Sequence, residues 1–229
     1  MKLIIFDCDG TLVDSQHIIV AAMDEAFRAT GLMPPDEAAT RSIIGLSMFE
    51  AIDRLHPGLE ADRIEAVKLA YRDAFIAQNK DTETMFDGAE DAVRRLAARD
   101  DVLLGIATGK SQRGVRRLLE ERDLGACFVT IQTADDAPSK PHPGMIRNAL
   151  GETGAPQDLA VMIGDTVFDM EMAVNAGIRG VGVSWGYHPP DHLAEAGARH
   201  IVDHFNALDE ALEALWQDPP PEGAAVMAP

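Results

Sequence analysis

The chain has 229 residues, of which 46% are hydrophobic, so it is long enough to bury a sizeable core and too apolar to be a disordered chain. Its formal net charge of −18 argues against nucleic acid or an anionic membrane as a partner, because both need a basic surface. Only five lysines are present, so a lysine inside a motif is informative: Lys2, Lys68, Lys80, Lys110 and Lys140.

The cysteines and the N-terminus both indicate a cytoplasmic protein. Cys8 and Cys127 fall in strand-like segments, and we expect two free thiols in a reducing compartment rather than a disulfide. The first apolar run is too short for a signal peptide and is interrupted by Asp7. No stretch approaches membrane-spanning length, so we expect no membrane association. The sequence leaves both a monomer and a homodimer open.

Short apolar runs alternate with helical patterns, which is typical of a parallel sheet covered by helices. The predicted strands are Leu3–Cys8, Val102–Thr108, Phe128–Thr133, Leu159–Ile163, Gly180–Ser184 and His200–Val202. Several are unbroken apolar runs, as expected for strands that are buried on both faces. The predicted helices between them are Ala89–Arg99, Gln112–Arg122, Gly144–Leu150, Phe168–Ala176 and Leu208–Trp216. The predicted fold class is therefore α/β, with a three-layer, Rossmann-like core around a parallel sheet.

One segment, residues 15–82, breaks this alternation because it contains no convincing strand. Its apolar residues recur at helical spacing, as in the row formed by Ile18, Ala22 and Ala26. We interpret the segment as an inserted helical cap domain, although the same helices would also fit as a simple cover for the sheet. The catalytic core would then consist of residues 1–14 and 83–217. Residues 218–229, which include three consecutive prolines, are predicted to be disordered.

Asp7 and Asp9 stand two residues apart at the carboxyl end of the first predicted strand, and Gly10 follows them. Ligands of open parallel sheets bind at that edge. Of two carboxylates in this position, one can attack or bind a metal while the other transfers a proton. The alternative is an ordinary turn, since Asp and Gly are common turn residues.

A second motif, Thr108-Gly109-Lys110, lies at the end of the next predicted strand. It offers a hydroxyl, a small residue that lets backbone N–H groups approach an anion, and the start of a helix, which together suit phosphate. A plain turn would explain the same residues. Lys110 either meets the substrate or is a solvated residue at the start of the helix.

Two further motifs follow later in the chain. Lys140 lies next to Pro141, which stiffens its backbone, and Asp165 and Asp169 follow the apolar run that ends at Ile163. Each motif lies at or beyond the end of a strand in one predicted sheet. Sparse carboxylates whose shell is completed by water favour Mg²⁺ over zinc or copper, so we expect Mg²⁺ as the cofactor.

Together these motifs resemble those of the haloacid dehalogenase superfamily. The four matching segments are Asp7-Cys8-Asp9-Gly10-Thr11, Thr108, Lys140 and Gly164-Asp165 with Asp169. The helical insert resembles the cap of the first subclass, which is found in phosphoglycolate phosphatases and β-phosphoglucomutases. The resemblance covers roughly residues 2–216. It specifies the superfamily far better than the substrate.

The resemblance implies a phosphatase in which Asp7 attacks phosphorus and forms an aspartyl-phosphate. Asp9 would protonate the leaving alcohol and then deprotonate the hydrolytic water. Mg²⁺, bound by Asp7, the Asp9 carbonyl and Asp165, would offset the repulsion between carboxylate and phosphate, with help from Lys140. Asp169 would hold a metal-bound water or orient Lys140.

The phosphoryl oxygens would be bound by the Thr108 hydroxyl and the Gly109 N–H. Cys8 is not expected to be a nucleophile, because a strand residue between two site-facing aspartates points the other way. Only the N–H of Cys8 should face the phosphate. His17 and His142 are expected to be structural or exposed.

The insert would set the choice of substrate. Arg41 lies where caps of this type lower a loop onto the site, so it either binds a substrate carboxylate or second phosphate, or forms a surface salt bridge. Asp14 and Ser15, with residues 82–86, are the candidate hinges. A phosphoglycolate-like small phosphoester is the first expectation and a phosphosugar the second. Pyrophosphate or a phosphonate is a further option; the latter would need a cap lysine, Lys68 or Lys80.

Three other functions compete with a phosphatase. A true haloacid dehalogenase uses an attacking Asp without metal, and Asp9 argues against it because an acid two residues on serves a leaving alcohol and a metal. A phosphosugar mutase of the same fold tends to carry an apolar residue where this chain has Thr11. A non-catalytic binding protein is disfavoured because the expected acidic residues and the lysine are all present.

Overall fold

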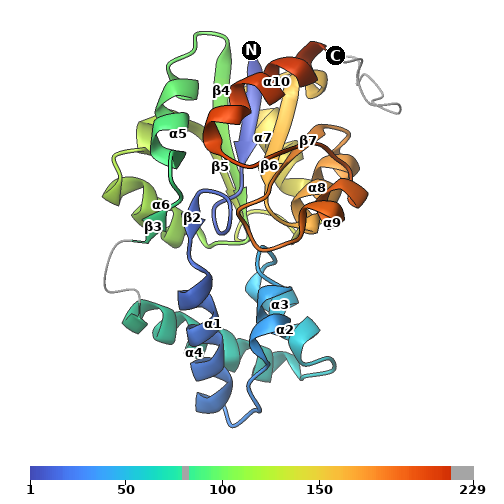
Figure 1. Ribbon diagram of the computed structural model, residues 1–229. Helices are drawn as coiled ribbons and strands as arrows, with labels where there is room; N and C mark the ends of the chain where they lie inside the picture. The colour runs from blue at the N-terminus through green and yellow to red at the C-terminus, as the bar shows by residue number, and fades with distance from the viewer. Residues whose placement is uncertain (79–82, 218–229) are drawn as a thin grey trace.

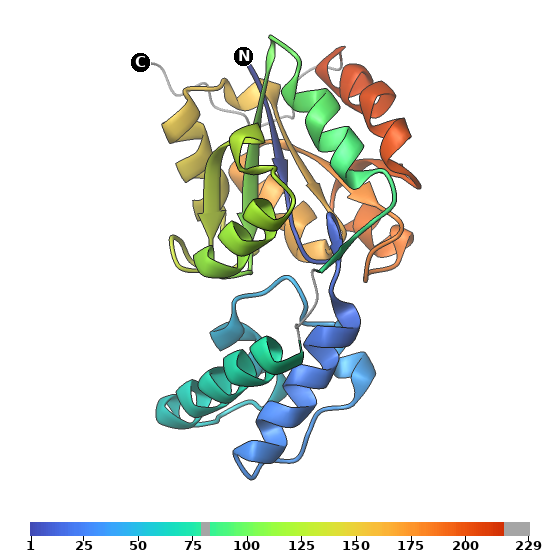
Figure 2. The same ribbon diagram turned by 90° about the vertical axis from the view of Figure 1, so that its left-hand side faces the viewer.

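A computed structural model describes residues 1–78 and 83–217 of the chain. A six-stranded sheet lies between two layers of helices, and a separate group of helices lies beyond one end of its strands (Figure 1, Figure 2). The strands of the sheet are β1 (Lys2–Phe6), β4 (Val102–Thr108), β5 (Phe128–Thr133), β6 (Ala160–Gly164), β7 (Arg179–Val183) and β8 (Ala198–Val202).

The strands lie in the order β5-β4-β1-β6-β7-β8, and every neighbouring pair is parallel. One face of the sheet is covered by α5 (Ala89–Ala97), α6 (Gln112–Glu121) and α10 (Leu208–Gln217). The other face is covered by α7 (Gly144–Thr153) and α8 (Val167–Ala176), and α9 (Pro190–Glu195) packs beside β7 and β8. The predicted fold class is confirmed.

The central strand β1 shows why the sheet forms. Ile4 and Phe6 belong to the apolar cluster on one face, whereas Leu3 and Ile5 belong to the cluster on the other face. All four side chains are fully buried, so the unbroken apolar run supplies both faces of a sandwiched strand. Because β1 pairs with β4 on one side and β6 on the other, its carboxyl end meets the ends of two other strands.

The helical insert, by which we mean residues 16–78, consists of α1 (Gln16–Ala29), α2 (Glu37–Arg41), α3 (Met48–Leu55) and α4 (Ala61–Gln78). It has its own apolar cluster, which Phe168 of α8 also joins. Figure 1 shows the insert facing the carboxyl ends of the sheet strands, opposite the N-terminus. The chain passes between the two parts through a small antiparallel ribbon of β2 (Val13–Asp14) and β3 (Thr84–Met85).

Some predictions differ from the structure in detail. The first strand ends at Phe6 rather than Cys8, because the Cys8 carbonyl accepts turn hydrogen bonds from the backbone N–H groups of Leu12 and Val13. Cys127 lies in a short 3₁₀ helix, η1 (Gly125–Cys127), and not in a strand. Both cysteines are free, as expected.

The division of the chain into a core and a cap domain remains a prediction. The predicted disordered tail and the first hinge residue of 82–86 lie outside the described residues. In the part of the chain that the structure describes, no helix has both the length and the apolar character needed to cross a membrane.

Candidate active site

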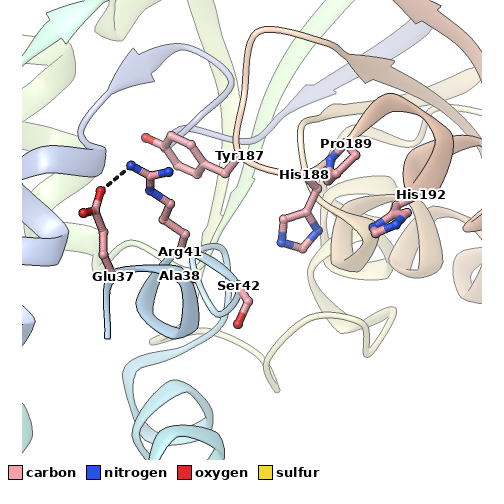
Figure 3. Close-up of a pocket in the computed structure, with 8 residues that line it drawn as sticks. All are labelled: Glu37, Ala38, Arg41, Ser42, Tyr187, His188, Pro189 and His192. Carbon is pink, nitrogen blue, oxygen red and sulfur yellow. Dashed lines mark hydrogen bonds and ion pairs between the residues drawn. The ribbon is translucent and has the colours of Figure 1, made fainter. Parts of the chain in front are cut away.

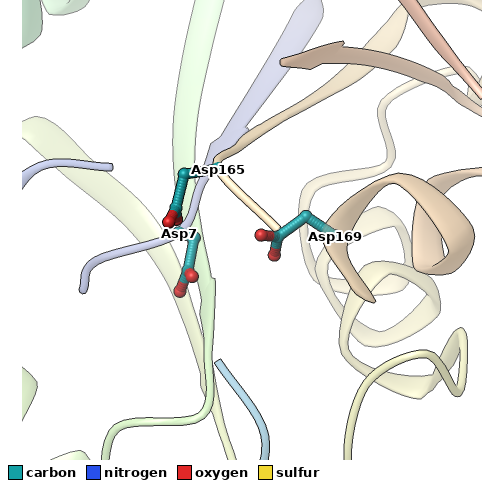
Figure 4. Close-up of side chains that lie close together, drawn as sticks. All are labelled: Asp7, Asp165 and Asp169. Atoms are coloured by element: carbon teal, nitrogen blue, oxygen red, sulfur yellow. The ribbon is translucent and has the colours of Figure 1, made fainter. Parts of the chain in front are cut away.

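Three buried carboxylates converge beyond the carboxyl ends of β1 and β6. Asp7 directly follows β1, Asp165 directly follows β6, and Asp169 lies in the first turn of α8. One oxygen from each lies within 4.8 Å of the others, and Figure 4 shows the three side chains close together, with the Asp169 carboxylate directed toward Asp7. Because β1 and β6 are parallel neighbours, the residues that follow them meet at the same edge of the sheet.

Asp7 is fully buried, and among the described residues neither of its carboxylate oxygens has a hydrogen bond of good geometry. Burial raises the pKa of Asp7 to about 7, against the opposing effect of Lys140 and with a further increase from Asp169. Burial removes the Asp7 carboxylate from water, and the positive charge nearby is too small to stabilise its ionised form fully, so its pKa rises. Asp7 is therefore a buried acceptor that is suited to a cation.

Lys140 supplies the positive charge next to this cluster. Its side chain is fully buried, and Nζ lies 2.9 Å from Asp7 Oδ1 and 2.6 Å from Asp169 Oδ1. Although burial acts to lower it, the charges of Asp169 and Asp7 raise the pKa of Lys140 above its usual value. Lys140 therefore stays protonated and fixes the distance between two of the three carboxylates.

The other two carboxylates are held by local structure. Asp165 accepts from the Thr11 hydroxyl at 3.0 Å and from the Tyr187 N–H at 2.9 Å. Asp169 forms a capping box with Thr166, in which its Oδ2 accepts from the Thr166 hydroxyl at 2.7 Å and the Thr166 N–H at 3.1 Å. Burial, together with the charges of Asp169 and Asp7, raises the pKa of Asp165 well above its usual value. Hydrogen bonds therefore orient both oxygens of Asp165, which has no ion pair with any described residue.

Gly10 permits the close approach of these groups. Its φ of +85° lies in the left-handed region that favours glycine. A Cβ at this position would lie 2.1 Å from Asp165 Oδ2 and 2.7 Å from Tyr187 Cε2. The glycine after the two aspartates is therefore needed for space as well as for backbone conformation.

Asp9 lies beside the cluster and is held by a separate set of contacts. Its Oδ1 accepts from the Ser15 hydroxyl at 2.6 Å and from Lys110 Nζ at 2.8 Å. Lys110 Nζ also lies 2.9 Å from Glu83 Oε2, and only 7% of the Lys110 side chain is exposed. Of the two alternatives for Lys110, the one in which it is a solvated residue is therefore wrong, because two buried carboxylates hold it in the interior.

The backbone of the insert closes directly over the second motif. A Cβ on Gly109 would lie 2.5 Å from the Leu46 carbonyl oxygen and 2.6 Å from that of Gly45. The next residue, Ser47, donates its N–H to the Ser139 hydroxyl at 2.8 Å. The loop at residues 45–47 thus contacts both the second motif and the segment that precedes Lys140.

Arg41 lines a cleft between the insert and the loop after β7. The cleft has a volume of about 520 Å³, and Figure 3 shows Tyr187, His188 and His192 on the side opposite α2. Arg41 forms an ion pair with Glu37 one turn away. The surface ion pair is thus present, and the alternative in which Arg41 binds an anionic group of the substrate stays a prediction.

The remaining predicted residues are placed as follows. Cys8 packs its side chain in the apolar cluster with Phe6, on the face of β1 opposite Leu3 and Ile5. Burial raises the pKa of the Cys8 thiol well above its usual value, so it is not a thiolate. Thr108 is buried, and its hydroxyl accepts from the Lys110 N–H at 3.2 Å.

The other candidate residues that the structure describes lie mostly at the surface. His17 and His142 are exposed, as expected. Lys68 is 49% exposed and forms an ion pair with Glu65, and Lys80 lies outside the described residues. Tyr187 and Glu83 were not predicted as site residues from the sequence. Tyr187 follows the end of the predicted strand Gly180–Ser184, and that position at the same sheet edge is the signal that would have indicated it.

Comparison with known proteins identifies the family. Residues 4–183 match the family model described as haloacid dehalogenase-like hydrolase. The chain belongs to this family. The superfamily and the phosphatase class of hydrolase predicted from the motifs are confirmed.

Several haloacid dehalogenase-like relatives match nearly the whole chain. A probable phosphatase, IndB, of Dickeya dadantii is 35% identical and is covered to 94%, with 93% of this chain aligned. Phosphoglycolate phosphatase 1 of Pseudomonas aeruginosa is 29% identical and is covered to 83%, with 95% of this chain aligned. Pyrophosphatase PpaX of Listeria monocytogenes is 31% identical and is covered to 93%, with 90% of this chain aligned.

A solved structure extends the likeness to three dimensions. A hydrolase from Pseudomonas syringae superposes with a TM-score of 0.84 at 27% identity. The match covers 93% of this chain and 99% of that one. The helical insert is therefore within the region that the two proteins share.

Proposed function

We propose that the chain is a Mg²⁺-dependent phosphatase that hydrolyses a small phosphorylated metabolite through an aspartyl-phosphate on Asp7. The observation that carries this proposal is that Asp7, Asp165 and Asp169 each bring an oxygen within 4.8 Å of the others, with Lys140 in contact with Asp7 and Asp169. The names of the relatives, which include phosphatases and a pyrophosphatase, point in the same direction.

The donor set fits a divalent ion with hard oxygen ligands. Asp7 and Asp165 would hold Mg²⁺ together with the backbone carbonyl of Asp9, and Asp169 would hold a metal-bound water or orient Lys140. Both oxygens of Asp7 are buried without a good hydrogen bond among the described residues, and burial raises the pKa of Asp7 and Asp165. When bound, Mg²⁺ supplies positive charge that offsets the repulsion between the phosphate dianion and the carboxylates.

Asp7 would act as the nucleophile. One of its oxygens attacks phosphorus in line, so that a new O–P bond forms as the bond from phosphorus to the leaving oxygen breaks. Lys140 Nζ, which lies 2.9 Å from Asp7 Oδ1, neutralises part of the charge that gathers there. The Thr108 hydroxyl and the N–H groups of Cys8 and Gly109 would bind the phosphoryl oxygens.

Asp9 would carry out both proton transfers. It gives a proton to the leaving oxygen in the first step and removes a proton from the hydrolytic water in the second. Two donors, Ser15 and Lys110, both bond its Oδ1, and within the described residues no donor bonds Oδ2. Oδ2 is therefore the oxygen suited to exchange a proton with the substrate.

The helical insert, with residues 15 and 79–82, would act as a cap over the core formed by residues 1–14 and 83–217. Its loop contacts Gly109, so a closed cap would exclude bulk water while the leaving group departs. The hinges would be Asp14 and Ser15 on one side and the chain around β3 on the other. As substrate we propose a phosphoglycolate-like phosphoester, with a phosphosugar next.

A panel of phosphorylated metabolites, including phosphoglycolate, pyrophosphate and glucose phosphates, tests the proposal when phosphate release is measured with Mg²⁺ and with EDTA. We expect Mg²⁺-dependent release from at least one small phosphoester, and complete loss in Asp7→Asn. Retained activity on a haloacid in EDTA would favour a dehalogenase instead. Conversion of one glucose phosphate into another without release would favour a mutase. Wild-type turnover in Asp7→Asn would refute the covalent mechanism.

A further inference from the structure

The contacts of Lys110 assign it a place in the interior. Nζ lies 2.8 Å from Asp9 Oδ1 and 2.9 Å from Glu83 Oε2, and the side chains of all three residues are at least 88% buried. The Lys110 stem lies against Gly114 of α6, where an added Cβ would be 3.0 Å from Lys110 Cγ. A flexible lysine that is packed along its stem and paired at its end cannot move freely toward a substrate.

Glu83 and α4 fix Lys110 from the side of the insert. Glu83 lies in the segment that returns from the insert, immediately before β3. The Phe75 ring, which belongs to α4, has its centroid 5.3 Å from Lys110 Nζ, close enough for a cation–π contact. The charge of Lys110 is thus shared between Asp9 in the core and groups on or next to the insert.

We propose that Lys110 is a positioning residue for Asp9, held in place by Glu83, rather than a ligand of the phosphate. The proposal rests on the proposed function, because it assigns a partner to the group that exchanges the proton. Lys110 and Ser15 together hold Oδ1, which fixes the rotation of the carboxylate and leaves Oδ2 for the leaving oxygen. Glu83 acts on Asp9 through its contact with Lys110.

Two substrates with different leaving groups distinguish this positioning role from a general structural role. p-Nitrophenolate departs readily without a proton, whereas phenolate is more basic and gains more from an acid. Loss of Asp9 positioning should therefore slow the hydrolysis of phenyl phosphate more than that of p-nitrophenyl phosphate. Loss of a phosphate ligand, or of a residue needed only for folding, would slow the hydrolysis of both esters equally.

The experiment measures kcat and KM for both esters with Mg²⁺ in the full chain. For Lys110→Met we expect kcat on phenyl phosphate to fall about tenfold or more, with a much smaller fall on p-nitrophenyl phosphate and little change in KM. Glu83→Gln, which keeps the pair between Lys110 and Asp9, should show the same pattern to a lesser degree. Lys110→Arg should restore part of the loss on phenyl phosphate.

A double variant tests the order of the contacts. If Glu83 acts through Lys110, adding Glu83→Gln to Lys110→Met should change kcat no further. The matched control is Lys68→Met, which removes an exposed lysine paired with Glu65 and should leave both esters unaffected. Thermal unfolding of each variant shows whether it is folded. If Lys110→Met does not fold, the comparison of the two esters is made with Glu83→Gln instead.

The outcomes are distinguishable. Equal losses on the two esters, or a rise in KM alone, would overturn the positioning role while leaving the phosphatase intact. Additive effects of Lys110→Met and Glu83→Gln would overturn the relay through Lys110. If the wild-type chain hydrolysed neither ester with Mg²⁺, or if Asp7→Asn remained active, the proposed function itself would fail.

Discussion

Gly109 provides a direct test of whether the insert must close over the second motif. Substitution by alanine would place a Cβ 2.5 Å from the Leu46 carbonyl oxygen and 2.6 Å from that of Gly45. These are backbone atoms that cannot rotate away, so the loop would have to move by about 0.9 Å to restore an ordinary contact of 3.4 Å. Gly109 is not among the glycines with positive φ, so alanine introduces no backbone strain.

The size of this displacement sets the expected loss of activity. A misplacement of about 1 Å at the reacting groups can cost about 10²-fold in rate. We therefore expect kcat/KM of Gly109→Ala on p-nitrophenyl phosphate with Mg²⁺ to fall by about 10²-fold, or about 2.7 kcal/mol of transition-state stabilisation. Alanine keeps the backbone N–H of residue 109, which is the proposed phosphate donor. A fall in kcat/KM would therefore reflect displacement of the insert and not loss of this donor.

The matched control is Gly151→Ala in α7. A Cβ at Gly151 has no atom within 4 Å, and alanine in a helix interior stabilises by about 0.5–1 kcal/mol relative to glycine. This variant should keep wild-type kcat/KM. A folded Gly109→Ala variant with near-wild-type kcat/KM would refute the argument, because it would show that the loop is not needed in the observed position.

Three further predictions concern charge. Lys140→Met removes the cation from a fully buried site and leaves Asp7 and Asp169 without their ion-pair partner. In urea unfolding without Mg²⁺, the free energy of unfolding should therefore fall by about 3–5 kcal/mol. An unchanged unfolding midpoint would contradict this prediction. Burial raises the pKa of Asp7 from 3.8 to about 7, so between these pH values the folded metal-free protein holds a proton that the unfolded chain lacks. On account of this group, metal-free stability should fall as pH rises through that range. Mg²⁺ competes with the proton, so it should raise Tm more at pH 8 than at pH 5.5, and equal shifts would count against a metal at Asp7. Arg41→Ala should raise KM for a substrate with a second anionic group but not for p-nitrophenyl phosphate; unchanged KM for both would remove Arg41 from the substrate site.

The sheet and the carboxylate cluster were predictable because both follow from short stretches of sequence. The mixed segment Phe128–Thr133 and the apolar run that begins at Val102 and ends at Thr108 both form strands with the predicted bounds. Asp7 and Asp165 each follow a run of this kind, and the rule that parallel strands end at one edge is enough to bring them together. Local sequence patterns are therefore enough to predict that Asp7 and Asp165 lie close together.

The surroundings of Asp9 were not predictable in the same way. Glu83 lies in a segment with no apolar pattern, and its contact with Lys110 depends on how the chain returns from the insert. The contact of Gly45 with Gly109 depends likewise on the packing of the insert against the core. The helix α9 was also missed, because it has six residues and begins at a proline, too short for a helical period to be recognised.

The distribution of charge explains how so acidic a chain can handle phosphate. Within residues 1–78 and 83–217, two lysines lie near the site, and each is already shared between two carboxylates: Lys140 between Asp7 and Asp169, and Lys110 between Asp9 and Glu83. If all four carboxylates are ionised, each group of three keeps a net negative charge, so neither lysine is free to attract an anion from a distance. Attraction must then come from a cation held by the cluster and from backbone N–H groups, which carry no formal charge. In the proposed function, the lysines set the geometry of Asp7 and Asp9, and a bound metal would carry the positive charge that the substrate meets.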